Sequence, residues 1–307
     1  MAAVGTPSQT AGMHAGALKL LDELGGFATT RQLLTVMTRQ QLDVQVNTGG
    51  LSRIWYGVYG VGEPDLLGRL RALDLFMGQR AIACLGTAAR LYGFDTEDTT
   101  AVHVLDPGVR MRPTLGLMVH QRVGAQLRSV AGRLAIAPAW TAVEIARQLQ
   151  RPRALATLDA AVHSGRCTPP ELDRAVLEQG GRRGIVAVRE LMPYVDGRAE
   201  SAMESEARLV MIDYGVPTPE LQYPIYGRDG QLWRADFAWP DVKVAAEYES
   251  VDWHAGGPAM LRDKKRSAGI QDVGWTSIPI VAEDVRRHPA RTAARIKRQL
   301  VRSRLAS

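Results

Sequence analysis

Two apolar runs near the C-terminus, each with a carboxylate inside it, constrain the fold of this chain more than any other feature. The runs are Leu232–Trp239 and Val242–Glu249, and they contain Asp236 and Glu247. An unpaired charge is costly to bury, so a carboxylate in a buried strand indicates a functional role. Strand alternation places Glu249 on the face of Glu247, and pairing of the two runs would bring the three acids together. Hard divalent cations prefer such clustered carboxylate oxygens.

The elements around these runs follow the order helix, strand, strand, strand, helix, strand, with a further helix appended. Ser201 and Glu204 form a capping pattern at the first helix, and the Asp-Gly step at 229–230 is a hairpin signal. We expect helices at 201–214, 258–270 and 289–305, and strands at 221–226, 231–239, 242–249 and 275–281. This order predicts an αβββαβ core over residues 197–307, with Glu204 approaching the acids.

The element order and its acids resemble the PD-(D/E)XK nuclease superfamily, specifically the branch similar to very-short-patch repair endonucleases. The Gly274-Trp275 step that opens the last core strand also fits that branch. The resemblance covers residues 197–307 and implies a restriction-endonuclease-like core. It further implies Mg²⁺ or Mn²⁺ as the cofactor of an active enzyme, with Asp236, Glu247 and Glu204 as the metal ligands.

The same resemblance implies a set of catalytic residues, with one departure from the superfamily pattern. The implied residues are Asp236, Glu247, Glu249, His254 and Lys264. His254 follows the third strand, where this branch often has a histidine that could move protons. Glu249 stands where the superfamily usually has lysine, and Lys264 could supply the missing positive charge from the following helix. Because of this departure, the domain can have the endonuclease-like fold without being an active enzyme.

These acids also have structural interpretations. Glu204 is equally suited to cap the helix that it opens. Asp236 and Glu247 could form ion pairs with Arg234 or Arg262 instead of binding a metal ion. The sequence leaves both interpretations open.

Basic side chains follow the acids in two places, and both could face either a DNA backbone or solvent. The first is the run 262–266, which could clamp a phosphate, and the second is a stripe along the last helix. The members are Arg262 and Arg266 in the run, and Arg291, Arg295, Arg298 and Arg302 in the stripe. Contacts of this kind would make DNA binding depend on salt.

Residues 13–62 predict three short helices followed by a β-hairpin, which is the order of a winged helix. The third helix begins after Thr38, with Gln41 in a capping box, and the hairpin turns near Tyr56-Gly57. In a helix-turn-helix, the second motif helix enters the major groove. The side chains expected to contact DNA are Arg39, Gln40 and Gln41 on the helix, and Arg53 on the hairpin.

This segment resembles the N-terminal domain of the AbiEi family of antitoxins. The shared features are the stretch Gly25–Leu33 and the closing stretch Arg53–Val61. The resemblance implies promoter DNA binding and autoregulation, and a cognate toxin as a partner. A winged helix used for protein contact is the alternative.

Residues 63–196 predict a mixed α/β connector in which we identify no chemistry. Capping boxes predict helix starts at Thr141 with Glu144 and at Thr168 with Glu171. The histidines of the connector have no neighbours at ligand spacing, and we assign no role to them: His103, His120 and His163.

Composition bounds the partners and the compartment. The net charge of +6 favours an anionic partner such as DNA. Cys84 and Cys167 are isolated, which is typical of a reducing compartment. The sequence has no apolar run of membrane-spanning length, so we expect a cytoplasmic protein with residues 1–12 as a flexible leader.

These features predict an α+β or α/β multidomain protein with two competing functions. One is a DNA-binding protein with a Mg²⁺-dependent endonuclease domain. The other is a non-catalytic AbiEi-like antitoxin or transcriptional regulator whose nuclease-like fold only binds nucleic acid or a partner. A protein-interaction adaptor is a third class. The candidate partners are DNA, a cognate toxin and a second copy of the chain, and no membrane.

Overall fold

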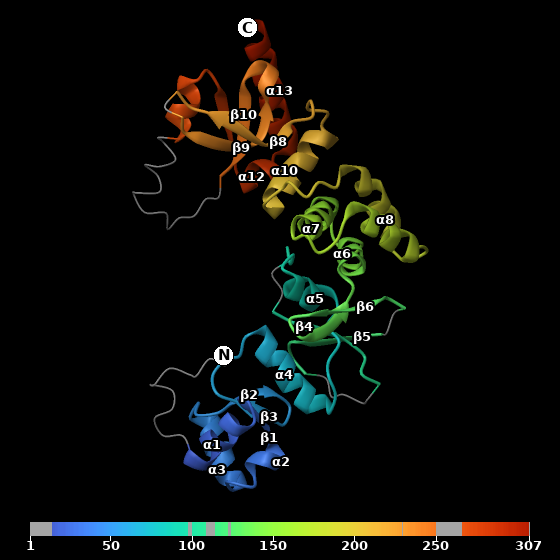
Figure 1. Ribbon diagram of the computed structural model, residues 1–307, viewed down its shortest axis with the longest axis vertical. Helices are drawn as coiled ribbons and strands as arrows, with labels where there is room; N and C mark the ends of the chain where they lie inside the picture. Colours follow the sequence, from blue (N-terminus) through green and yellow to red (C-terminus); the bar gives the residue numbers. More distant parts are fainter. Residues whose placement is uncertain are drawn as a thin grey trace. The chain divides into compact units, whose positions relative to one another are not determined.

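The computed structural model describes residues 14–97, 100–108, 114–121, 124–228, 230–249 and 266–306 (Figure 1). The chain divides into two compact units. The first unit comprises Met1–Leu91 and Glu97–Ala137, and the second comprises Tyr92–Thr96 and Pro138–Ser307. The predicted middle region, 63–196, therefore contributes to both units. The predicted domain boundaries stay a prediction, and the predicted leader 1–12 lies outside the described residues.

The N-terminal part of the first unit is built from short capped helices and a small sheet. Its elements are α1 (Ala15–Glu23), β1 (Phe27–Thr29), α2 (Thr30–Leu33), α3 (Arg39–Asn47), β2 (Ser52–Trp55) and β3 (Val58–Gly60). The capping box of Thr38 and Gln41 is confirmed, and the strands pair in the order β1-β3-β2. Leu33, Leu42 and Leu51 are buried in the core beneath them. The helices and the hairpin lie where the sequence predicted, and their assignment as a winged helix stays a prediction.

The rest of the first unit combines helices with two pairs of short strands. The elements are α4 (Leu66–Met77), α5 (Leu85–Tyr92), β4 (Val102–Leu105), β5 (Leu117–His120), β6 (Leu127–Val130) and β7 (Arg133–Ile136). β4 and β5 are parallel, whereas β6 and β7 form an antiparallel hairpin that the sequence did not indicate. Arg133 donates to Asp74 at 2.6 Å and so ties this hairpin to α4.

The second unit begins with a group of helices. They are α6 (Pro138–Ala146), α7 (Arg151–His163), α8 (Pro169–Glu178), α9 (Ile185–Leu191) and the short η1 (Met192–Tyr194). The capping box at Thr168 and Glu171 is confirmed. The one predicted at Thr141 and Glu144 is wrong, because α6 begins at Pro138 and buries both side chains. Glu144 instead faces Arg147 and Arg182.

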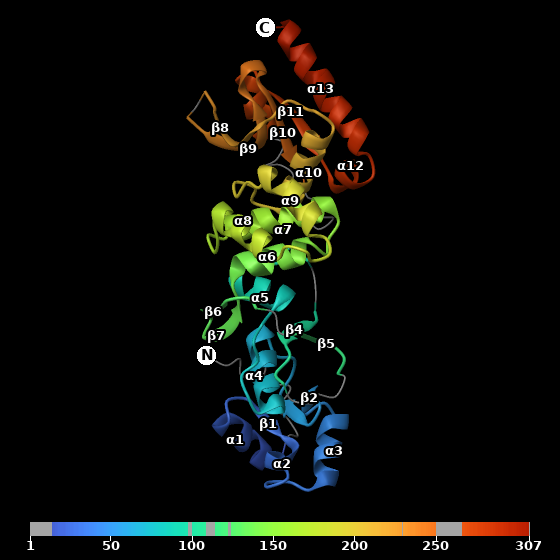
Figure 2. The same cartoon turned by 90° about the vertical axis from the view of Figure 1, so that its right-hand side faces the viewer.

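The C-terminal part of the second unit is a four-stranded sheet with helices (Figure 2). Its elements are α10 (Ala202–Asp213), β8 (Glu220–Tyr226), β9 (Leu232–Trp239), η2 (Pro240–Val242), β10 (Val244–Tyr248), β11 (Thr276–Ile280), α12 (Ala282–Arg286) and α13 (Pro289–Ala306). Residues 266–272 are also helical. The strand order is β11-β10-β9-β8, with β10 and β11 parallel and the other pairs antiparallel. This is the predicted order of elements, and its identity as an endonuclease core stays a prediction.

One hydrophobic cluster joins the sheet to α10 and α13. From the strands it contains Phe237, Ala246 and Ile278, and from α13 it contains Ile296 and Leu300. Alternation along β10 turns the side chain of Glu247 to the opposite face, where it meets Arg266. Among the described residues, the helices are all too short or too polar to cross a membrane.

Candidate functional site

Asp236 and Glu247 lie just beyond the paired residues of β9 and β10. The two strands pair Ala238 with Ala245 and Phe237 with Ala246, and Asp236 and Glu247 follow the last of these pairs. The amide N–H of Tyr248 donates to Oδ2 of Asp236 at 2.8 Å. The side chain of Asp236 therefore reaches the backbone of β10 at the residue that follows Glu247.

Asp236 lies in surroundings that favour its protonated form. Burial, as the largest cause, and the neighbouring acids Glu204 and Glu200 together raise the pKa of Asp236 to about 6. The Tyr248 amide and the charge of Arg266 act in the opposite direction but do not outweigh burial. Its carboxyl therefore titrates near neutral pH, which is the behaviour of many functional carboxyl groups.

Glu247 is held by an arginine. Nη2 of Arg266 lies 3.1 Å from Oε2 of Glu247, whose side chain is 14% exposed. Arg266 also donates to the backbone carbonyl of Arg234 at 2.6 Å. The structural interpretation predicted an ion pair of Glu247 with Arg234 or Arg262. The partner in the described residues is Arg266, and Arg234 pairs with Glu200 instead.

Glu204 adopts the geometry of a capping residue. Its Oε1 accepts from the Ser201 hydroxyl at 2.7 Å, and its Oε2 accepts from the backbone N–H of Glu200 at 3.0 Å. The side-chain amide of Gln222 donates to the same Oε2 at 2.8 Å. These three bonds satisfy the buried carboxylate and tie α10 to β8.

The described residues do not fit a divalent cation as they stand. Arg266 neutralises Glu247, and the oxygens of Glu204 are occupied by donors. Glu249 is exposed, with its amide bonded to the carbonyl of Ile280. In the part of the chain that the structure describes, no three acidic, histidine or cysteine side chains gather as metal ligands would. The predicted residues His254, Arg262 and Lys264 lie outside that part.

The predicted DNA-contacting side chains of the first unit differ in whether they contact other residues of the protein. Arg39 and Gln40 are exposed on α3. The side chain of Gln41 already makes a contact within the protein, because its Oε1 accepts from the backbone amide of Thr38 at 2.8 Å. Arg53 is exposed on the hairpin and lies over the Tyr59 ring, 5.8 Å from its centroid.

Sequence reasoning missed a set of buried ion pairs that joins α7 to α10. Arg208 meets Asp159 at 2.6 Å, with both side chains less than a tenth exposed. Glu206, 2% exposed, accepts from Arg153 and from both Nε and Nη2 of Arg286. The available signal was the presence of Glu206 and Arg208 in a helix whose neighbouring residues are apolar.

Two further features were also missed. His103 and His120, which have no partner at ligand spacing in the sequence, meet across β4 and β5 with Nδ1 and Nε2 3.0 Å apart. Burial and the neighbouring His120 lower the pKa of His103.

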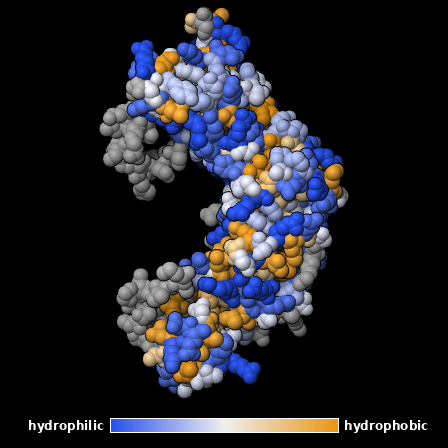
Figure 3. Space-filling model, viewed as in Figure 1, coloured by the Kyte–Doolittle hydropathy of each residue, from blue (hydrophilic) through white to orange (hydrophobic). Residues whose placement is uncertain are grey.

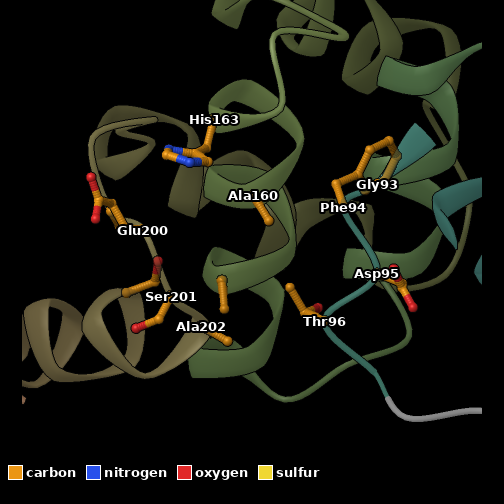
Figure 4. A pocket seen from close by; sticks show the side chains of 12 residues that line it. Gly93, Phe94, Asp95, Thr96, Ala160, His163, Glu200, Ser201 and Ala202 are labelled. Carbon is orange, nitrogen blue, oxygen red and sulfur yellow. The ribbon is translucent and has the colours of Figure 1, made fainter. Parts of the chain in front are cut away.

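A pocket of about 320 Å³ opens between α7, residues 93–96 and the start of α10 (Figure 4). Ala160 and Ala202 give it an apolar wall.

Comparison with known proteins connects this chain to antitoxins and to two mycobacterial proteins. Residues 81–194 match the family model of the AbiEi antitoxin C-terminal domain. Two proteins from two strains of Mycobacterium tuberculosis, both described as uncharacterized, are each 72% identical to this chain over 270 residues. That alignment covers 88% of this chain and the full length of each relative. The AbiEi match thus falls on the region in which the sequence showed no chemistry.

Proposed function

Because this chain belongs to the family of the two M. tuberculosis proteins and matches an AbiEi antitoxin domain over residues 81–194, we propose that it is an AbiEi-like antitoxin and transcriptional regulator. The family match carries the proposal. The exposed polar side chains of α3 and the hairpin support DNA binding. In this proposal residues 13–62 form a winged helix, and the protein is cytoplasmic.

Recognition in this proposal uses α3 and the hairpin for different tasks. Arg39 and Gln40 lie in the first turn of α3, where a recognition helix contacts base edges. Arg53 contacts a phosphate, and its position over Tyr59 limits the freedom that it loses on binding. A homodimer would present two such helices to a pseudo-palindromic site.

A footprint on the DNA upstream of the protein's own gene tests this function. We expect protection of a defined site by the wild-type protein, and its loss in the double variant Arg39→Ala, Gln40→Ala. The matched control is Lys19→Ala, which removes an 81% exposed cation from α1. Equal protection by all three proteins would exclude α3 as the recognition helix.

An antitoxin also has a protein partner, and we propose a cognate toxin for this chain. Co-expression with the product of the adjacent gene tests this part of the proposal. We expect that product to arrest growth alone, and the full chain to restore growth and to co-purify with it. Growth arrest that the chain does not relieve would contradict the antitoxin role.

A Mg²⁺- or Mn²⁺-dependent DNA endonuclease is a second candidate, supported by the hydrogen bond that holds Asp236 against the strand that carries Glu247. The described residues alone do not form its metal site, so His254 and Lys264 would have to complete the constellation. Glu249 in place of lysine favours the regulator. In that reading, the nuclease-like fold binds without cutting.

A nicking assay separates the two candidates. Plasmid and single-stranded DNA are incubated with Mg²⁺ or Mn²⁺ and with the wild-type, Asp236→Ala or Glu247→Ala protein. Activity confined to the wild-type protein would support the endonuclease. Equal nicking by all three would trace the activity to another source, and no nicking with intact promoter binding would favour the regulator.

A further inference from the structure

We propose that the solvent-facing side of α13 binds the sugar-phosphate backbone of nucleic acid, as a surface separate from α3 and the hairpin. This surface, the α13 basic face, consists of Arg291, Arg298 and Arg302. The inference deepens the proposed DNA-binding function and rests on it for the identity of the ligand. It concerns affinity without sequence preference, because phosphate contacts position a protein but do not read bases.

The helical geometry places the three arginines away from the protein core. At 3.6 residues per turn, Arg291, Arg298 and Arg302 lie within about 40° of one another, on the side opposite Leu300. All three are exposed, whereas Ile296 and Leu300 are buried in the cluster with the sheet. Spacings of seven and four residues separate them by about 10 and 6 Å along the axis. Along a duplex axis, those intervals correspond to about three and two phosphate steps of one strand, at about 3.4 Å per step.

Arg295 belongs to the predicted stripe but has another task. Its Nη2 donates to the carbonyl of Pro279 at 2.7 Å and to Oδ2 of Asp284 at 3.0 Å. These bonds fix α13 to the end of β11 and to α12. The stripe therefore divides into one anchoring arginine and three exposed arginines that make no such contact with a described residue.

The charge of the exposed side is uncompensated. No aspartate or glutamate occurs from Pro289 to Ala306. Five exposed cations of α13 make no hydrogen bond or ion pair with another described residue: Arg291, Lys297, Arg298, Arg302 and Arg304. In Figure 3, strongly hydrophilic residues stand beside single hydrophobic ones on the visible face of the C-terminal part.

Burial of the apolar side of α13 favours nucleic acid over a lipid surface. An amphipathic helix binds a membrane by inserting its apolar face among the lipids. In α13 that face is occupied, because Ala293, Ile296 and Leu300 pack against the sheet and α10. The remaining exposed large apolar residues of α13, Val301 and Leu305, are neighbours one turn apart and form a patch of only two side chains.

The α13 basic face is also independent of the carboxylate pair. α13 packs on the side of the sheet that carries Phe237 and Ala246. Alternation along β10 turns Glu247 to the other side, where it pairs with Arg266, and Asp236 is bonded to the backbone of β10. Arg291, Arg298 and Arg302 make no hydrogen bond or ion pair with either acid, so binding at α13 is expected to persist when Asp236 and Glu247 are replaced.

A salt titration of DNA binding tests the proposal. The variant Arg291→Gln, Arg298→Gln, Arg302→Gln is compared with a control that removes three exposed arginines around α8 and α9, namely Arg174→Gln, Arg183→Gln, Arg189→Gln. Binding to a duplex of random sequence is measured by fluorescence anisotropy across a KCl series. Each phosphate contact contributes about 0.9 to the slope of log K against log salt, so we expect a slope about 2.7 shallower for the α13 variant.

The outcomes separate this inference from the proposed function. Equal slopes for wild type and the α13 variant would overturn the inference, as would wild-type binding to phosphatidylserine vesicles but not to the duplex. Loss of the promoter footprint in the Arg39→Ala, Gln40→Ala variant, with an unchanged α13 slope, would leave the regulator intact and remove only this surface. A slope that depends on α13, without any footprint, would support the surface and contradict the regulator.

Discussion

Two groups of carboxylates in the second unit differ in what surrounds them. On α7 and α10, Asp159 and Glu206 each meet arginines and are almost fully buried. On β9, Asp236 meets one backbone amide and has acidic neighbours. Burial acts to raise the pKa of Glu206, but the hydrogen bonds from Arg286 and Arg153 hold it below its ordinary value. Burial raises the pKa of Asp236 to about 6.

The difference separates a structural role from a candidate functional one. Glu206, with two arginine partners, keeps its proton off and holds α7, α10 and α12 together. Asp159 has one arginine partner, and there burial outweighs Arg208 and raises the pKa of the carboxyl group. A carboxylate with partial compensation, such as Asp236, changes charge near neutral pH. A pKa that is shifted far from its ordinary value marks functional sites more often than structural ones. Each of the following variants alters one side of this contrast.

The largest effect is expected for Arg208→Ala. Removing this arginine leaves Asp159 buried with the Asp196 amide, at 2.8 Å, and the Ser205 side chain as its remaining donors. Breaking a buried ion pair by removing one partner costs about 3–5 kcal/mol in the free energy of unfolding. Urea denaturation followed by circular dichroism measures this loss.

The matched control for Arg208→Ala is Arg234→Ala. Arg234 forms an ion pair with Glu200, but both side chains are about half exposed, so we expect a loss of at most about 1 kcal/mol. Similar losses for the two variants would show that the Arg208–Asp159 pair contributes no more to the free energy of unfolding than an exposed ion pair does.

A smaller effect with a distinct pH dependence is expected for Glu206→Gln. The variant loses charged hydrogen bonds to Arg153 and Arg286, which are worth about 2–3 kcal/mol together because both arginines keep partial access to water. The pKa of Glu206 is depressed, so its stabilisation is complete above the ordinary value of 4.5 and is lost as the pH falls through the folded pKa. Denaturation curves of wild type and variant are therefore expected to converge in acid. A constant difference from pH 7 to pH 3 would contradict this explanation.

Local patterns in the sequence predicted much of the fold. The αβββ order of residues 201–249 followed from the capping pattern at Ser201, the Asp-Gly hairpin step and the two apolar runs. These signals act over a few residues, so a single sequence contains them. The hairpin β6–β7 was missed because its strands are only four residues long and β6 is mostly exposed, which leaves too short an apolar pattern to detect. The start of α6 was misplaced because Thr141 and Glu144 imitate a capping box inside a helix.

The candidate site was predictable only in part. Strand alternation predicted that Asp236 and Glu247 lie close together, and this stays a prediction, because the paired register of β9 and β10 ends at Phe237 and Ala246. The partners of these acids were not predictable, because Arg266 reaches Glu247 through tertiary packing. The ion pairs of Asp159 and Glu206 join residues 49 and 80 positions apart, and spacing rules say nothing about such distances. The AbiEi-matched region gave no signal because its buried residues reflect packing.

The variant Asp236→Asn is expected to stabilise the protein. Asp236 has a folded pKa of about 6 against an ordinary 3.8, so the wild-type fold loses stability as the pH rises between these values. Asparagine removes the charge and can still accept from the Tyr248 amide. We expect a gain of about 1–2 kcal/mol at pH 7, less than the full shift because the remaining hydrogen bond is weaker. The gain should disappear below pH 3.8, as thermal unfolding across pH will show.

Glu247→Gln is the control for this variant and is expected to have the opposite sign. It removes a partly buried ion pair with Arg266 and so costs up to about 1 kcal/mol at pH 7. Stabilisation by both variants would mean that the two acids repel each other more than Arg266 compensates.

The smallest stability effect, about 1 kcal/mol, is expected for Glu204→Ala, and it decides between the capping and metal-binding roles of this residue. Alanine removes the acceptor of the Glu200 amide and the Ser201 hydroxyl, a loss typical of a helix cap. A cap acts without a cation, so the loss should be the same in Mg²⁺ and in EDTA. Because the charge of Glu204 raises the pKa of Asp236, the variant should also lower that pKa, which NMR titration of the carboxyl carbon can follow. A metal ligand would instead show a Mg²⁺-dependent loss, which would move Glu204 from the structural to the functional side of the contrast.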